Sequence, residues 1–232
     1  RVALFAALIF TTACSLDGSN ASSRGAFDGS AKAAPAKSPQ DSARQLRLFG
    51  QGDLGNDLVF EMRSASGLEQ HTTSSEGADF DPSVDPAGKR LVFASTRHSR
   101  FSHLYIKPIE GTTLTQLTDE SANDAQPVFS PDGRRVAFTS DRAGQWDIWM
   151  IDLNGHNAIQ ITQSPMVELH PSWSPDGTRI VYCRVNPRER RGELWIANLD
   201  RPGVKQMIGE GLFPSWSPKA AKIAFQKART RG

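Results

Sequence analysis

Six polar residues recur at fixed distances ahead of three prolines, and their types and spacing could do chemistry. In each repeat an acid stands three residues before the proline, and a second polar residue stands directly before it. A ring of carboxylate, carboxamide and imidazole groups could bind a cation, a peptide or a sugar. The alternative is that these side chains cap loops and bond backbone groups. The candidate ligand-binding residues are Asp79, Asp81, Asp124, Gln126, Glu168 and His170.

The sequence predicts no catalytic residue. None of the five histidines belongs to an HExxH motif, and no Gly-x-Ser-x-Gly elbow is present. Segment 50–55 matches the Gly-x-Gly-x-x-Gly dinucleotide pattern, but a polar linker precedes it and a predicted strand follows, which is the wrong context. We therefore expect no enzymatic activity, no metal and no cofactor.

The elements that must position these residues form a repeat. Four segments align, each with a proline at its second position, a tight turn and then an apolar strand: 81–93, 126–138, 170–182 and 213–225. Their prolines, Pro82, Pro127, Pro171 and Pro214, are 45, 44 and 43 residues apart. A period of about 40–45 residues with several short strands per unit is typical of a β-propeller blade.

Taken together, the repeats contain the signals for four strands per unit. Ser-Pro-Asp-Gly suits a tight turn, because proline presets the backbone and glycine takes the left-handed conformation. A short strand precedes the turn and an apolar strand follows it. Third strands are predicted at 103–107, 147–151 and 193–197, and fourth strands at 114–118 and 158–162. Aromatic residues on these strands would form a core between blades.

The repeat resembles the TolB-type β-propeller family over roughly residues 57–228. The resemblance rests on Ser-Pro-Asp-Gly, on Thr-Ser-Asp-Arg at 139–142, on Asp147-Ile-Trp and on Ile161-Thr162. It implies an all-β propeller of four-stranded antiparallel blades, with three complete blades and two half blades in this chain. Either the chain is a fragment of a six-bladed ring, or 57–62 and 68–72 complete a composite blade that closes a four-bladed ring.

The N-terminus is predicted to be an export signal. Residues 1–14 combine a positive charge, a short apolar run and a small residue before Cys14. They resemble a lipoprotein signal with a lipobox-like end, which implies lipidation of Cys14; an ordinary cleaved signal is the alternative. Residues 15–45 lack large apolar side chains and are predicted to be a disordered linker, and 46–232 are predicted to form the propeller.

Two further groups of residues have structural interpretations. Arg97, Arg142 and Arg184 recur after the second strand and should form ion pairs, with Asp141 and Asp147 as nearby opposite charges. Cys183 falls on a predicted inner strand and should be a buried small hydrophobe.

A net charge of +2 gives no electrostatic reason to expect nucleic acid as a partner.

These observations favour an exported, non-enzymatic binding module that mediates protein–protein interaction in the bacterial cell envelope. The resemblance to the TolB family implies a periplasmic location and partners such as a peptidoglycan-associated lipoprotein. The lipobox-like end at Cys14 implies that the only membrane contact is an N-terminal lipid anchor in the outer membrane. Two alternatives remain. The chain could be a carbohydrate- or metal-binding propeller of the lyase type, or the propeller part of a larger peptidase or sensor.

Overall fold

The computed structural model describes residues 69–74, 76–154, 157–186 and 191–227. The chain divides into two compact units, Arg1–Glu69 and Gln70–Gly232, and the features below belong to the second. The predicted signal, Cys14, the linker and the strand at 57–62 lie outside the described residues and stay predictions. Glu69–Thr72, the described part of the predicted strand at 68–72, form no strand. Within the described residues, no helix has the length and apolar character needed to cross a membrane.

In the part of the chain that the structure describes, fourteen strands make up three four-stranded sheets and one two-stranded sheet, all of them antiparallel. Consecutive strands pair in chain order within each sheet, as a propeller of four-stranded blades requires. The first blade contains β1 (Asp79–Val84), β2 (Arg90–Ser95), β3 (His103–Pro108) and β4 (Thr115–Gln116). The second contains β5 (Asp124–Phe129), β6 (Arg135–Ser140), β7 (Asp147–Asp152) and β8 (Ala158–Gln160). The third contains β9 (Val167–Trp173), β10 (Arg179–Asn186), β11 (Arg191–Asn198) and β12 (Lys205–Glu210), and a C-terminal half blade contains β13 (Leu212–Trp216) and β14 (Ile223–Gln226).

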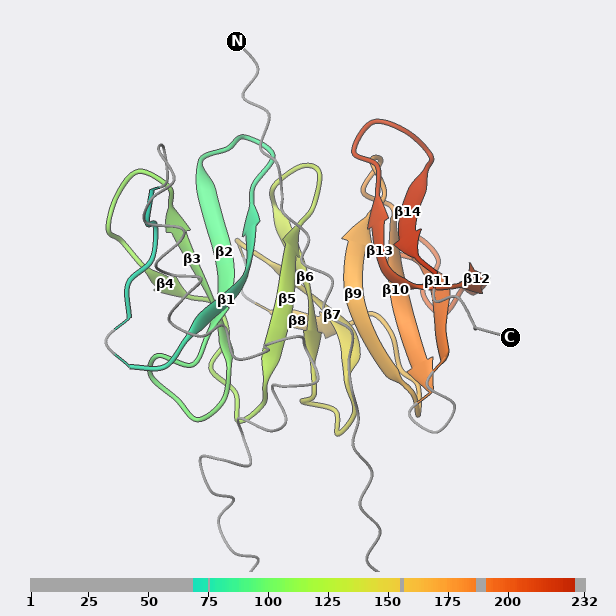
Figure 1. Ribbon diagram of the computed structural model, residues 1–232, viewed down its shortest axis with the longest axis horizontal. Coiled ribbons are helices and arrows are strands. Elements are labelled where there is room, and N and C mark those ends of the chain that lie inside the picture. Colours follow the sequence, from blue (N-terminus) through green and yellow to red (C-terminus); the bar gives the residue numbers. More distant parts are fainter. Residues whose placement is uncertain (1–68, 75, 155–156, 187–190, 228–232) are drawn as a thin grey trace, which may run out of the picture. The chain divides into compact units, whose positions relative to one another are not determined.

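The first strand of every blade packs against the first strand of the next. Strand β1 contacts β5, β5 contacts β9, and β9 contacts β13. The arrows of these inner strands point the same way in Figure 1, so their first residues gather at one end of the row. This arrangement of antiparallel sheets confirms the predicted fold class, and it brings the candidate residues of successive repeats to the same end.

The Ser-Pro-Asp-Gly turn has the geometry that its residues predict. In the second blade the N–H of Gly133 donates to the carbonyl of Ser130 at 2.9 Å, and Gly133 has a φ of 68°. A side chain at that φ would be strained, so glycine suits the position. The corresponding Gly177 of the third blade also has a φ of 68°. The turn sets the register between the inner strand and its neighbour in each blade.

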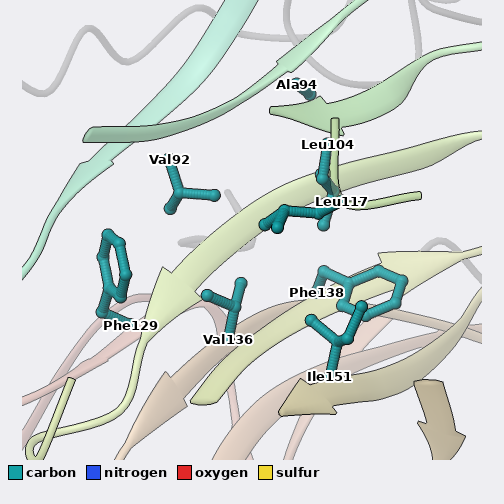
Figure 2. Close-up of a cluster of buried hydrophobic side chains, with 8 residues drawn as sticks. All are labelled: Val92, Ala94, Leu104, Leu117, Phe129, Val136, Phe138 and Ile151. Atoms are coloured by element: carbon teal, nitrogen blue, oxygen red, sulfur yellow. The ribbon is translucent and has the colours of Figure 1, made fainter. Parts of the chain in front are cut away.

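The hydrophobic core lies between blades (Figure 2). One cluster joins four side chains of the first blade to four of the second; a comparable cluster joins the second blade to the third. Burying each large apolar side chain contributes about 1.5–3 kcal/mol, so stability is spread over the joints between blades. The first cluster consists of Val92, Ala94, Leu104, Leu117, Phe129, Val136, Phe138 and Ile151.

An arginine at the start of the second strand in each four-stranded blade reaches into the next blade. Arg90 donates to the carbonyl of Gly133 and lies 5.3 Å from the ring centre of Phe129. Arg135 repeats both contacts with Gly177 and Trp173 one blade later. These paired contacts fix the position of each blade on its neighbour, because they combine a charge-assisted hydrogen bond with a cation–π contact.

Candidate functional site

The acids of the first two blades lie at the start of the inner strands, as predicted, and both are held by arginine. Asp79 accepts hydrogen bonds from Ser95 Oγ and Arg97 Nη2, both at 2.6 Å. Burial alone would raise the pKa of Asp79, but hydrogen bonds from Arg97 and Ser95 hold it below its usual value. Asp79 is therefore ionised at neutral pH and fully engaged in structural contacts.

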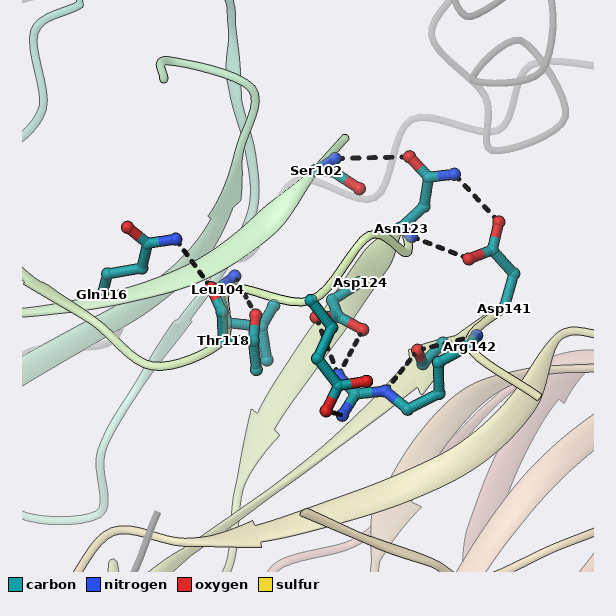
Figure 3. A network of polar contacts seen from close by, with 10 residues as sticks. Ser102, Leu104, Gln116, Thr118, Asn123, Asp124, Asp141 and Arg142 are labelled. Atoms are coloured by element: carbon teal, nitrogen blue, oxygen red, sulfur yellow. Dashed lines mark hydrogen bonds and ion pairs between the residues drawn. The ribbon is translucent and has the colours of Figure 1, made fainter. Parts of the chain in front are cut away.

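Arg142 is the centre of the equivalent network in the second blade (Figure 3). Its Nη2 donates to both carboxylate oxygens of Asp124, at 2.9 and 3.0 Å, and its Nη1 donates to Glu120 at 2.9 Å. The guanidinium also lies over the ring of Trp149, 4.9 Å from its centre. Burial raises the pKa of Asp124, and Arg142 opposes that rise.

The predicted pairing of the recurring arginines is confirmed, but the expected partners were wrong. Arg142 pairs with Asp124 and Glu120, and not with Asp141 or Asp147. Asp141 instead accepts hydrogen bonds from the backbone and side chain of Asn123. The reason is the pairing of β5 with β6, which sets Asp124 opposite Ser140, two residues before Arg142.

Glu168, the acid of the third blade, has no such arginine. Its side chain is fully buried, and within the described residues neither carboxylate oxygen has a hydrogen-bond partner. Arg184 stands where the other blades have serine, and it pairs with Glu193 at 3.0 Å while lying over Trp195. Burial raises the pKa of Glu168 to about 7.

The residues directly before the prolines share an unusual backbone. Asp81, Gln126, His170 and the corresponding Phe213 have φ values of 51–57°. Residues other than glycine rarely occupy this left-handed region. Each lies at an irregularity in the pairing of the inner strand with its neighbour, and bulges of this kind re-aim side chains at functional sites. We call these four residues the axial row.

Members of the axial row are linked from one blade to the next. The N–H of Gln126 donates to Asp81 Oδ2 at 3.1 Å, and the N–H of His170 donates to Gln126 Oε1 at 2.8 Å. Gln126 Oε1 also accepts a hydrogen bond from Thr139 at 3.0 Å. The ring of His170 lies 4.5 Å from the ring of Phe213, centre to centre. The structure thus brings Asp81, Gln126 and His170 together.

Burial controls the charge of the axial row. It lowers the pKa of His170 to about 4, so the imidazole is neutral at pH 7. Burial also raises the pKa of Asp81, and the N–H of Gln126 opposes the rise. Within the described ranges, no three histidine, cysteine or acidic side chains are grouped so as to hold a metal ion. The row can offer hydrogen bonds and aromatic contact to a ligand.

Two features of these networks were missed by the sequence reasoning: a serine that recurs before the arginines, and an acidic neighbour of Glu168. Ser95 and Ser140 occupy the same register position before the recurring arginines, and both contact them. A serine two residues before both Arg97 and Arg142 is visible in the sequence and could have predicted these contacts. Asp147 is the second: it lies beside Glu168, although the two belong to different repeats. Cys183 is free and fully buried, as predicted.

The family model of the TolB β-propeller domain matches residues 57–230. The chain belongs to the TolB β-propeller family. The repeats, the antiparallel blades and the row of inner strands described above are the features that this match covers. The resemblance of the repeat to this family, which rests on Ser-Pro-Asp-Gly and its neighbouring motifs, is thereby confirmed.

Two relatives and two solved structures show how far the similarity extends. An uncharacterized protein of Agrobacterium fabrum is 28% identical over 185 residues, which are 75% of this chain and 62% of that protein. The Tol-Pal system protein TolB of Dinoroseobacter shibae is 30% identical over 123 residues, 48% of this chain and 26% of that protein. The chain therefore spans less than two thirds of the length of either relative.

The two structures show likeness of fold alone. TolB from Acinetobacter baumannii has a TM-score of 0.53 at 23% identity, over 63% of this chain and 37% of that one. Oligogalacturonate lyase from Vibrio parahaemolyticus has a TM-score of 0.55 at 15% identity, over 69% of this chain and 50% of that one. A TolB protein and a lyase thus share this blade architecture with the chain.

Proposed function

We propose that this chain is an exported, non-enzymatic propeller that binds a protein partner in the bacterial cell envelope. The family supports this proposal, because a relative in it carries the name Tol-Pal system protein TolB. The two carboxylates at the start of the first two inner strands form the ion pairs Asp79–Arg97 and Asp124–Arg142. Groups that are already committed to structural bonds are poor candidates for acid–base chemistry.

The single observation that carries the proposal is the use of Gln126. Its carboxamide oxygen accepts hydrogen bonds from the backbone N–H of His170 and from Thr139 Oγ1, and the backbone N–H of Gln126 donates to Asp81 Oδ2. A catalytic or sugar-binding role that used this oxygen as an acceptor would require it to give up the bond from His170, which joins two blades. We infer that the axial row forms a rigid edge against which a partner docks, with Asp79, Asp124 and Glu168 positioning the strands beneath it.

Site-specific photo-crosslinking in cells tests the docking role. A photoreactive amino acid at Phe213, which is 51% exposed and contacts His170, should crosslink to one defined envelope protein. The control position is Val84, which is 49% exposed and lies at the other end of its inner strand. Affinity measured with the two purified proteins should fall in a His170→Ala variant.

Three results would overturn the proposal in favour of an alternative. Equal crosslinking from Phe213 and Val84 would show that the axial row is not the docking edge. Binding of oligogalacturonides, lost on changing His170 and Gln126 to alanine, would favour a carbohydrate-binding propeller of the lyase type. Hydrolysis of peptides by a longer product of the same gene would assign the chain to a peptidase.

Lipidation of Cys14 and periplasmic location belong to the same proposal. The sequence of residues 1–14 supports them, since a lipobox-like end would anchor the propeller through a polar linker. Labelled palmitate should enter the full chain and be absent from a Cys14→Ser variant. Labelling that persists in the variant would refute the assignment of this cysteine.

A further inference from the structure

The joint between the second and third blades contains two buried carboxyl groups. Asp147 opens β7 and is 2% exposed, and Glu168 lies at the start of β9 and is fully buried. The N–H of Glu168 donates to the carbonyl of Trp146 at 2.7 Å, and the side chain of Glu168 lies next to that of Asp147. The preceding joint uses the same backbone bond, from Asp124 to Ser102, but has His103 in place of Asp147.

Between the first and second blades, Arg142 balances the charge of Asp124. No arginine occupies the same position between the second and third blades. Arg142 donates to both oxygens of Asp124, whereas the residue at the same register in β10 is Asn186. Arg184, two residues earlier, is committed to Glu193. The second joint therefore brings two carboxyl groups together without an arginine between them.

The other strands around Glu168 supply little compensating charge. The positive charge of Lys205 on β12 lowers the pKa of both carboxyl groups, but its Nζ donates to the carbonyl of Gln163 at 3.3 Å and pairs with neither of them. The charged residue of β5 is Asp124, which is paired with Arg142. The charged residue of β6 is Arg135, whose guanidinium donates to the carbonyl of Gly177 in the third blade. Strand β13 carries no charged residue. On β9 itself His170 is neutral, and on β10 the hydroxyl of Tyr182 is buried beside Glu168.

Hydrogen-bond donors are distributed unequally over the pair. Asp147 accepts from Gln160 Nε2 at 3.0 Å and from the N–H of Ser164 at 3.2 Å, so its negative charge is stabilised. Glu168 has the hydroxyl of Thr162 as a donor, which lowers its pKa, but within the described residues neither of its oxygens makes a hydrogen bond of normal geometry. A buried carboxylate with so few donors and no ion-pair partner is strongly disfavoured, whereas a protonated carboxyl becomes a donor itself. The geometry therefore favours a proton on Glu168 and a charge on Asp147.

We propose that Asp147 and Glu168 share one proton that joins the second blade to the third, and that its loss as pH rises weakens this joint. The O–H of Glu168 donates to the carboxylate of Asp147, and on deprotonation the proton passes to solvent. The pair then carries two negative charges between the blades. This proposal does not depend on the proposed function.

The direction of the pH effect follows from the two states of Glu168. Burial raises the pKa of Glu168 to about 7 in the folded chain, against 4.5 for the ordinary side chain. The unfolded chain loses this proton from pH 4.5 upward, while the folded chain keeps it until about pH 7. Stability from this group is therefore complete below pH 4.5, declines as pH rises through 7, and changes no further above that.

Unfolding of the 232-residue chain between pH 5 and 9 tests the proposal, with Glu168→Gln as the variant. Glutamine has a hydrogen-bonding side chain of the same length that does not titrate between pH 5 and 9. The unfolding constant of the wild type, divided by that of the variant, should rise by up to tenfold per pH unit to pH 7 and then level off. Because both proteins contain His170, its titration cancels in this ratio.

Asp79→Asn is the matched control. Asp79 has an arginine partner and a lowered pKa, so the same ratio for this variant should stay constant from pH 5 to 9. A constant ratio for Glu168→Gln would overturn the proposal. So would a stoichiometric metal ion in the purified chain whose removal by a chelator abolishes the pH effect, since a cation would then balance the pair.

Infrared spectroscopy of the wild type decides the question if Glu168→Gln does not fold. A buried protonated carboxyl gives a carbonyl stretch separate from that of a carboxylate, and this band should be present at pH 6 and lost by pH 9 while the chain remains folded. Absence of the band at pH 6 would overturn the proposal.

Discussion

Replacing Arg142 with alanine should destabilise the chain more than any other single change to the ion pairs described here. The variant leaves Asp124 fully buried without the two hydrogen bonds from Nη2, and it removes the cation from the ring of Trp149. Breaking a buried ion pair on one side costs about 3–5 kcal/mol, because the remaining charge is uncompensated. For a chain of this size, each kcal/mol lowers Tm by roughly 2–4 °C.

Arg97→Ala is the matched control for that prediction. Its partner Asp79 is 13% exposed at the side chain, whereas Asp124 is 0% exposed, so water can replace part of the lost interaction. Thermal unfolding of both variants should show the larger loss for Arg142→Ala. The double variant Arg142→Ala with Asp124→Asn should recover part of the loss, because no buried charge remains.

Three results would refute the reasoning about Arg142. Equal losses for Arg142→Ala and Arg97→Ala would show that burial of the acid does not set the cost. A loss below about 1 kcal/mol for Arg142→Ala would place this pair with exposed surface pairs. A double variant less stable than Arg142→Ala alone would show that Asp124 contributes without its arginine.

Three further outcomes follow from the axial row and the buried thiol. The wild type should lose at most about 3 kcal/mol of stability as pH falls from 6.5 through 4, because the folded chain keeps the His170 ring neutral while the unfolded chain protonates it. His170→Phe should remove this loss. Chemical unfolding of both proteins at pH 4.5 and 7 measures the difference, and equal pH profiles would contradict the prediction. Gln126→Ala should cost about 1–3 kcal/mol in urea unfolding, since it leaves the N–H of His170 and the hydroxyl of Thr139 without their acceptor, and an unchanged midpoint would contradict that role. Burial raises the pKa of Cys183 to about 12, so a thiol reagent at pH 8 should react with it only after unfolding, and rapid labelling of the folded chain would refute this.

The sequence alone predicted the fold because its signals are local and repeated. Ser-Pro-Asp-Gly specifies a turn within a few residues, and alternating or apolar runs specify the strands on either side of it. Their recurrence at Pro82, Pro127, Pro171 and Pro214 then indicated blades, since one unit cannot bury its apolar faces alone. The positions of the candidate acids at the start of the inner strands followed from the same alignment.

Tertiary structure decided which of these residues meet. Arg142 pairs with Asp124 because β5 and β6 place them at the same end of the blade, and no spacing in the sequence distinguishes this partner from Asp141 or Asp147. The link from Gln126 to His170 joins residues 44 positions apart. Glu168 and Asp147 become neighbours only when two blades pack, and the burial that perturbs both carboxyl groups exists only in that joint. Local chemistry thus determined the blades, while packing between them determined the charge and protonation of the site.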